Sequence, residues 1–323
     1  MAVFRFQAGP FSMRLEDKEA KLMQNTSKLK GRELVRHVLE NGVTVNIPKG
    51  ELCITDGAVK KVMGTAEVGF AEKEAFVETM GLDIYSLSPD YPRQGKELPA
   101  RKDYLWPELE NWTAETPYFI FAVLDGAFEW GMRLLGFAEF CSNLRSSAVM
   151  SALIEQVEKL NFYMIEKLAA EGVNGIILAD DIAHQHGLFA RPQVLQDLFI
   201  PSLARQTEQI LKQDLPVFFH SDGNYRDVLS DIINIGVSGL ECLEKTAGMQ
   251  IEELQAAVGQ EVCLWGHLDT DDLEAAAKDE GMLADLVDST RALAAGKKFI
   301  LGTTSGIFEG MRLDVLQELY SKV

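Results

Sequence analysis

Cysteine is scarce in this sequence, and long apolar runs are absent. The four cysteines, at positions 53, 141, 242 and 263, form no Cys-x-x-Cys pair, so neither a disulfide framework nor a zinc knuckle is indicated. No apolar run reaches the roughly 18 residues of a membrane-spanning helix, and the first residues lack the apolar core of a secretory signal. We therefore expect a cytoplasmic protein in a reducing environment, with no membrane partner.

Basic residues and nucleotide-binding glycine patterns are also lacking. The 49 Asp and Glu residues outnumber the 31 Lys and Arg residues, which gives a net charge of −18. Nucleic acids bind basic surfaces, so this balance argues against a nucleic-acid partner. No Gly-x-Gly-x-x-Gly turn follows an early strand, so we expect neither a nicotinamide nor a flavin cofactor.

The sequence does contain a regular alternation of strand-like and helix-like segments. Short β-branched or aromatic runs predict eight strands, at residues 43–47, 82–87, 118–124, 175–179, 216–219, 238–243, 262–266 and 299–302. Amphipathic patterns predict helices at 146–171, 192–212, 226–235, 251–258, 273–295 and 313–323. Such alternation predicts parallel strands joined by right-handed crossovers. We therefore predict an α/β fold: a single (β/α)8 TIM-type barrel at residues 41–323, with an N-terminal helical extension at 1–40 packed on it.

The polar residues that follow the predicted strands define a candidate site. In such a barrel the active site forms at the carboxyl ends of the strands. Four of the five histidines fall at these ends, and His37 is the exception. The predicted catalytic residues are Asp90, Asp181 and His220, and the predicted substrate-binding residues are Asp125, Asp180, His184, His186, His267, Thr303 and Ser305.

A His-x-Asp pair after the fifth predicted strand is the central feature of this rim. His220 and Asp222 are two residues apart, so on an extended strand they point to the same side. The pair can bind a metal ion or act as an acid–base pair, and with Glu241 it forms a candidate metal-ligand set. Cys242 follows Glu241 directly, so we expect it to face the other side of its strand and to pack against helices.

Three other rim features have competing interpretations. One carboxylate of the Asp180–Asp181 pair can face the pocket while the other caps a loop. His184 and His186 can contact a substrate or simply be solvated in a loop. The segment 302–306 has the composition of a phosphate-binding turn after the last strand, but it contains no Lys or Arg.

Several segments resemble the uroporphyrinogen decarboxylase-like superfamily. They are GVNGIILADD at 172–181, GLFARP at 187–192, FIP at 199–201, FHSDGN at 219–224 and GHLDT at 266–270. The resemblance runs from about Gly31 to the C-terminus and is looser over the first hundred residues. It implies the same barrel fold and is compatible with two chemistries.

In the decarboxylase branch of the superfamily, the resemblance assigns the catalytic aspartate to Asp90. The Arg-Gln-Ala-Gly-Arg-Tyr segment of that branch has no full counterpart, since residues 5–9 lack the second Arg and the Tyr. The histidine after its last strand falls on Ser305, and the serine after its fourth strand falls on Asp181. An additional aspartate repels a polycarboxylate substrate, so the resemblance favours a different activity.

In the corrinoid-linked methyltransferase branch, zinc is held by a His-x-Cys pair after strand five and a Cys after strand eight. The histidine matches His220, whereas the two cysteine positions are Asp222 and Ser305. Activation of a thiol substrate is therefore not expected. A harder site of His220, Asp222 and Glu241 can hold zinc as a Lewis acid, which suits an ether, alcohol or amine methyl donor.

We therefore predict a methyltransferase that moves a methyl group from a small methylated donor to a corrinoid carried by a partner protein, with zinc as the candidate metal. The alternatives are a decarboxylase and a non-catalytic binding barrel. A homodimer is compatible with the sequence. Metal analysis of the purified protein, with a spectral test for cobalamin binding, separates these hypotheses.

Overall fold

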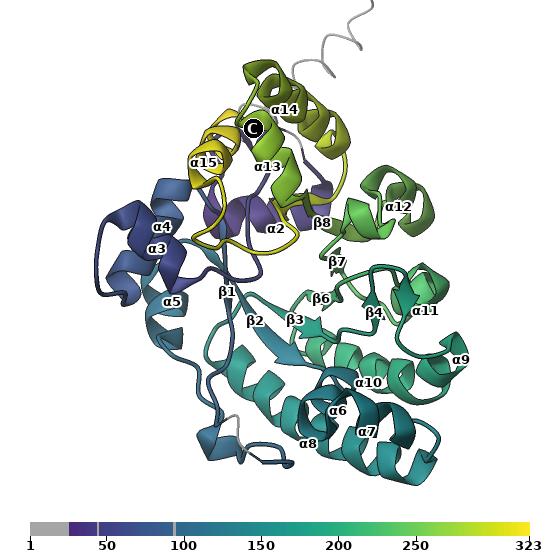
Figure 1. Cartoon of the computed structure of the whole chain (residues 1–323). Coiled ribbons are helices and arrows are strands. Elements are labelled where there is room, and N and C mark those ends of the chain that lie inside the picture. The colour runs from purple at the N-terminus through teal and green to yellow at the C-terminus, as the bar shows by residue number, and fades with distance from the viewer. Residues whose placement is uncertain (1–25, 44, 93–94) are drawn as a thin grey trace, which may run out of the picture.

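A curled parallel sheet forms the centre of the molecule (Figure 1). The computed structural model describes residues 26–43, 45–92 and 95–323. The sheet has seven strands in the order β1-β2-β3-β6-β7-β8-β9, and every neighbouring pair is parallel. These strands are β1 Ile84–Leu87, β2 Phe119–Asp125, β3 Gly175–Ala179, β6 Val217–His220, β7 Gly239–Glu241, β8 Cys263–Leu268 and β9 Phe299–Thr303.

The segment around Lys49 lies between the two outer strands of this sheet. The Lys49 carbonyl accepts a hydrogen bond from the Ile84 amide at 3.1 Å, on the β1 side. On the β9 side, the Leu301 amide donates to the Pro48 carbonyl at 2.9 Å, and the Gly50 amide donates to the Leu301 carbonyl at 3.0 Å. The segment therefore closes the sheet into the predicted TIM-type barrel.

This closing segment is not the regular strand that the sequence predicts at 43–47. Residue 44 lies outside the described residues, and in the rest of the segment the pairing is limited to single bridges, such as those of Val43 and Lys49. Pro48 has no amide hydrogen and cannot donate to a ladder. Gly50 is required by space, because a Cβ there would lie 2.6 Å from the Cβ of Ile84. In the described residues of 43–47 the structure therefore has an isolated bridge at Val43 in place of the predicted strand.

Helices surround the barrel and follow most of the predicted ranges. The α-helices are α2 Gly31–Asn41, α3 Asp56–Met63, α4 Phe70–Met80, α5 Leu109–Glu115, α6 Ala127–Leu135, α7 Phe137–Asn143, α8 Ser147–Ala170, α9 Pro192–Val194, α10 Ile200–Leu211, α11 Leu229–Asn234, α12 Ile251–Val258, α13 Thr270–Ala276, α14 Glu280–Ala294 and α15 Leu313–Lys322. Short 3-10 helices are η1 Arg101–Asp103, η3 Arg226–Val228 and η4 Lys245–Ala247.

Three predicted helices are divided in the structure, and one of them, 226–235, contains η3 and α11. The range 192–212 contains α9, the π-helix η2 Leu195–Phe199 and α10. Pro201 explains the wider turn, because it has no amide hydrogen and its ring clashes with the carbonyl four residues before it. The range 273–295 contains the end of α13 and all of α14, separated at Asp279, whose side chain accepts from the Gly281 amide.

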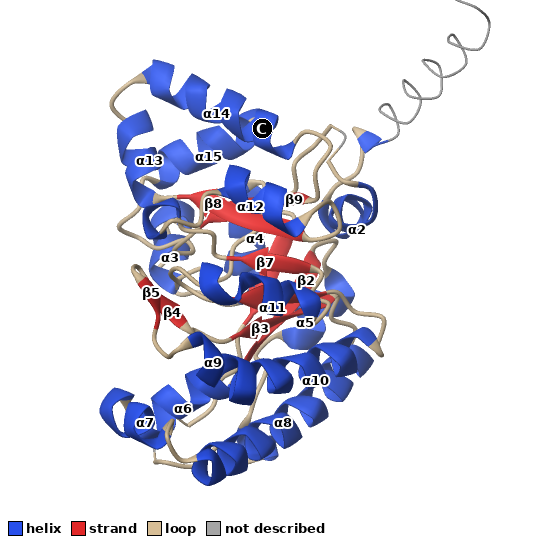
Figure 2. Cartoon of the chain, turned by 90° about the vertical axis from the view of Figure 1, so that its right-hand side faces the viewer, coloured by secondary structure: helices blue, strands red, loops and turns tan. Residues whose placement is uncertain are grey.

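The barrel interior is filled by side chains and is closed at one end by α2. The interior residues are mainly aromatic and aliphatic, and they include Phe121, Phe218 and Trp265. Val35 of α2 belongs to the same cluster, and the Gly31 amide donates to the carboxylate of Asp83, just before β1. Figure 2 shows α2 and the small hairpin of β4 (Ala183–His184) and β5 (Gly187–Leu188) on opposite sides of the sheet. The carboxyl ends of the strands therefore face away from α2.

Candidate active site

His220 and Glu241 form a buried pair at the carboxyl ends of two neighbouring strands. They are the last residues of β6 and β7 and are register partners. Nδ1 of His220 contacts the carboxylate of Glu241 directly. Both side chains are buried, so this contact fixes the orientation of the imidazole ring and leaves its Nε2 for other partners.

Two aspartates face the Nε2 atom of His220. Oδ1 of Asp181 lies 3.4 Å from it and Oδ1 of Asp222 lies 3.9 Å from it. The backbone amide of Asp222 also donates to Oδ1 of Asp181 at 2.9 Å, which joins the ends of β3 and β6. Burial alone would lower the pKa of His220, but the charges of Glu241 and Asp181 raise that pKa well above its usual 6.5. The hydrogen bond and positive charge of His220 in turn lower the pKa of Asp181 against the effect of burial.

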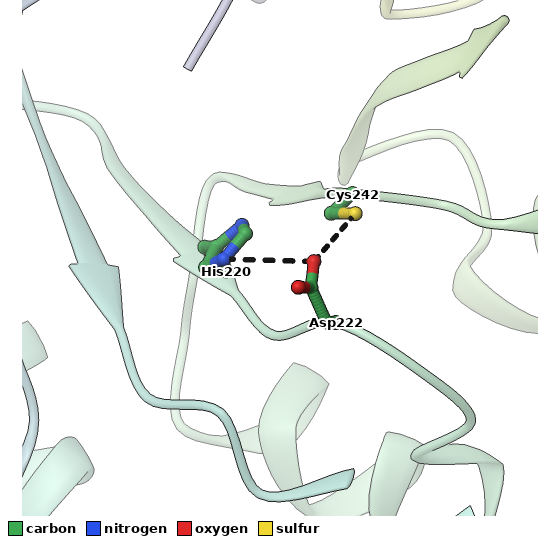
Figure 3. A group of neighbouring side chains, drawn as sticks. All are labelled: His220, Asp222 and Cys242. Carbon is green, nitrogen blue, oxygen red and sulfur yellow. Dashed lines mark hydrogen bonds and ion pairs between the residues drawn. The ribbon is translucent and has the colours of Figure 1, made fainter. Parts of the chain in front are cut away.

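Cys242 also belongs to this cluster, contrary to the prediction. Its Sγ lies 3.0 Å from Oδ1 of Asp222 and 3.2 Å from the Thr304 carbonyl oxygen, so the single S–H can donate to either acceptor. The backbone of Cys242 has φ +63°, in the left-handed region, so the alternation of the strand ends there. The thiol can therefore lie on the same side as Glu241. Figure 3 shows the side chains of His220, Asp222 and Cys242 directed toward one another.

The cluster has the donor atoms of a metal site. A ring nitrogen of His220, a carboxylate oxygen of Asp222 and the sulfur of Cys242 all lie within 4.8 Å of one another. Nitrogen, oxygen and sulfur together suit zinc. The sequence predicts Glu241 as a ligand, whereas its carboxylate contacts Nδ1 of His220. That is the position from which a carboxylate orients a metal-binding histidine.

Asp180 and Asp181 point to different places. Asp180 is fully buried, and its Oδ1 accepts from the Glu129 amide in the first turn of α6 at 2.7 Å. A Cβ on Gly126 would lie 2.3 Å from the Asp180 carboxyl carbon, so the turn before α6 is built around this side chain. Burial raises the pKa of Asp180 well above its usual value. Asp180 thus caps the turn, and Asp181 is the member of the pair beside His220.

Asp125 lies at the end of β2 and is engaged by a cation. Its carboxylate forms a 2.5 Å ion pair with Arg133 of α6 and accepts from the Tyr91 hydroxyl at 3.3 Å. Beside this group is a cavity of about 260 Å³ whose lining includes Tyr91, Trp130 and Arg133. The predicted substrate-binding residue Asp125 is therefore buried behind Arg133.

Three further predicted residues lie on the surface. The side chain of Asp90 is exposed, while its backbone forms two hydrogen bonds with Leu105. His184 and His186 are exposed on the β4–β5 hairpin, and the ring of His184 lies 5.1 Å from that of Phe189. None of these side chains has a contact with His220 in the described parts of the chain, and substrate contact stays a prediction for all three.

His267, Thr303 and Ser305 have separate surroundings. His267 is buried with its ring 6.0 Å from that of Phe299, and burial lowers its pKa to about 4, so the ring is neutral. Thr303 is buried and donates from its amide and hydroxyl to the carboxylate of Glu51. Ser305 is exposed on the loop that follows β9.

Glu51, which contacts Thr303, and Cys53, which contacts Ser305, lie close to the site, and neither is among the predicted site residues. Glu51 is fully buried, and its carboxylate also accepts a hydrogen bond from the hydroxyl of Tyr320 in α15. Burial raises its pKa to about 8, and the charge of Glu241 adds to the effect. Glu51 follows the first predicted strand, so its position at a strand end was the one available signal.

These features define an α/β barrel with a histidine, two aspartates and a thiol at the carboxyl ends of its strands. A family model described as uroporphyrinogen decarboxylase (URO-D) matches residues 121–323, more than half of the chain, and the chain belongs to this family. The family is the one that the rim motifs indicated.

Two solved structures show the same fold at low sequence identity. A methyltransferase from Methanosarcina mazei is 15% identical with a TM-score of 0.66, and the match covers 91% of this chain and 98% of that chain. A Listeria monocytogenes protein assigned as a vitamin-B12 independent methionine synthase is 11% identical with a TM-score of 0.50, covering 86% and 95%. No curated protein matches the sequence. Among the described residues, no helix is long and apolar enough to cross a membrane.

Proposed function

We propose that this protein is a methyltransferase that takes a methyl group from a small ether, alcohol or amine donor and delivers it to the cobalt of a corrinoid partner protein. The observation that supports it most is the arrangement around His220: Nδ1 is held by Glu241, while Nε2 faces Asp181 and Asp222 beside the Cys242 thiol. The fold likeness to a methyltransferase is consistent with this proposal.

The residues of the cluster would have different roles in methyl transfer: metal binding, orientation of the imidazole and handling of a proton. When bound, a zinc ion would act as a Lewis acid on the donor oxygen or nitrogen. His220, Asp222 and Cys242 would hold the ion, and Glu241 would keep the imidazole in the required orientation. As the methyl–heteroatom bond breaks, the methyl group passes to cobalt(I), which supplies the electron pair of the new bond. The departing heteroatom keeps its bonding pair, and Asp181, 3.4 Å from Nε2 of His220, would position or exchange its proton.

The charges around the site favour this activity over decarboxylation of a polycarboxylate. Arg133 forms ion pairs with Asp125 and Glu129, and Lys245 forms one with Asp272. Asp181 and Asp222 remain beside His220 at the rim. An anionic substrate would meet these carboxylates, whereas a neutral or cationic methyl donor would not be repelled. Decarboxylation remains the alternative because of the family to which the chain belongs.

The test uses free cob(I)alamin in place of the partner's corrinoid. The zinc-loaded protein is mixed with cob(I)alamin and a panel of O-methyl and N-methyl compounds, and methylcobalamin is followed by its absorbance. We expect one donor class to yield methylcobalamin and His220→Ala to slow the reaction by about 10²–10⁴-fold. Equal rates for wild type and His220→Ala would contradict the proposal.

A further inference from the structure

We propose that the thiol of Cys53 is a second sulfur ligand of the metal ion held by His220, Asp222 and Cys242. This inference rests on the metal site of the proposed function and extends it to a residue on another part of the barrel. Cys53 lies on the segment that closes the barrel between β9 and β1, and its carbonyl accepts from the Ile307 amide at 2.9 Å. The ligands would then come from three parts of the barrel wall: β6, β7 and the closing segment.

The two thiols flank the same short loop after β9. Sγ of Cys242 lies 3.2 Å from the carbonyl oxygen of Thr304, and Sγ of Cys53 lies 4.0 Å from that of the next residue, Ser305. Gly306 leaves the room for the second thiol, because a Cβ there would lie 2.4 Å from Sγ of Cys53. Gly306 also has φ +68°, which disfavours any side chain at that position. The loop is therefore shaped so that both sulfurs can be present.

Cys53 is within the electrostatic reach of the cluster. Burial of its thiol raises the pKa of Cys53, and the charges of Glu51, Glu241 and Asp222 raise it further, while His220 lowers it. The residue as a whole is exposed, and its contact with Ser305 is long. Binding of the ion would require Cys53 to change its side-chain rotamer, and such a change would cost only this long contact. In the present arrangement only the other three ligand atoms lie within 4.8 Å of one another.

The resulting donor set is one nitrogen, one oxygen and two sulfurs. Thiolates select zinc and other soft metals over magnesium or calcium. The two thiols and Nε2 of His220 must each be deprotonated to bind the ion. Each of these three groups that carries a proton beforehand should therefore release it when the metal binds. Catalytic zinc sites can expand to five ligands, so a methyl donor can still reach the ion.

Cobalt(II) provides a direct count of sulfur ligands. The full chain is titrated with cobalt(II), and the intensity of the sulfur-to-cobalt charge-transfer band is compared between wild type and Cys53→Ser. We expect the intensity of this band to fall by about half in Cys53→Ser. The zinc Kd should rise by at least about 100-fold, because losing a residue that only orients a ligand already weakens metal binding by up to about that factor. Cys141→Ser, on α7, is the matched control and should leave both values unchanged.

A second measurement uses the unaltered protein, so it does not depend on how a variant folds. Zinc should slow alkylation of Cys53 by iodoacetamide, followed by mass spectrometry, and should leave the rate at Cys141 unchanged. An unchanged band and zinc Kd in Cys53→Ser, or equal alkylation of Cys53 with and without zinc, would overturn the inference. Methyl transfer by wild type alongside such results would leave the proposed function standing. If two sulfur ligands are found but no methyl transfer occurs, the inference about Cys53 is supported and the proposed function is contradicted.

Discussion

The protonation of His220 determines whether its Nε2 can bind a metal ion. The charge of Glu241 is the main influence that raises the pKa of His220, so the ring holds a proton at neutral pH. A metal ion must displace that proton, and zinc affinity should therefore increase as the pH rises through the neutral range. Removing the negative charge with Glu241→Gln should lower the pKa of His220 and shift the midpoint of this profile to lower pH.

Zinc titrations between about pH 5.5 and 9 test this prediction. At the alkaline end, Glu241→Gln should still bind zinc about 10–100-fold more weakly, because the imidazole has lost its orienting carboxylate. Glu261→Gln, at an exposed position just before β8, is the control. A midpoint that stays in place or moves to higher pH would argue against the assigned role of Glu241.

Glu51 predicts a pH dependence of stability. Its folded-state pKa of about 8 lies above the unfolded value of 4.5. The stability associated with the protonated form is therefore complete below pH 4.5 and is lost as the pH rises toward 8. Glu51→Gln is neutral throughout, so its free energy of unfolding relative to wild type should increase between pH 5 and 9, on the order of a few kcal/mol. Urea unfolding measures this difference, and a constant difference across the range would contradict it.

At the scale of elements, the closing segment and β9 depend on close packing of backbone against backbone. A Cβ at Gly302 would lie 2.3 Å from the Gly50 carbonyl oxygen and 2.7 Å from Nε1 of Trp265. It would also disturb the 3.0 Å hydrogen bond from that indole to Gly50. We expect Gly302→Ala to lower the free energy of unfolding by about 1–3 kcal/mol or more.

The control for this change is Gly69→Ala, where the nearest atom is the flexible end of Glu72 at 3.4 Å. It should change stability by less than about 1 kcal/mol. Urea unfolding curves of the two variants provide the comparison. Equal effects would show that the closing segment is not tightly packed at Gly302.

The same elements show what the sequence could and could not predict. The strand at Gly175–Ala179 and the helix Ile251–Val258 were predicted to the residue, because apolar periodicity is a local property. The pairing of His220 with Glu241 depends on register between strands, and the position of Cys242 depends on a backbone angle. Neither is encoded in a spacing along one segment. Alternation alone therefore placed the Cys242 thiol on the wrong side.

The charge distribution of the whole molecule predicts that polycarboxylate substrates bind poorly. The net charge is −18, and the cations Arg133 and Lys245 near the rim are already paired with carboxylates. We expect no conversion of uroporphyrinogen at an enzymatic rate. Coproporphyrinogen formed with a kcat of about 1 per second or more, followed by chromatography, would replace the methyltransferase proposal with the decarboxylase alternative.

The metal content and turnover of His220→Ala show whether His220 serves a metal-dependent active centre. If the rim cluster is a metal-dependent active centre, wild type should bind one zinc ion per chain. His220→Ala should lose most of that zinc and slow methyl transfer by about 10²–10⁴-fold. His37→Ala, on α2 at the opposite end of the barrel, should retain both. If His220 has only a structural role, His220→Ala should instead lower the free energy of unfolding by about 1–3 kcal/mol and leave turnover unchanged. Wild-type zinc content and normal turnover in His220→Ala would show that the rim cluster is not a metal-dependent active centre.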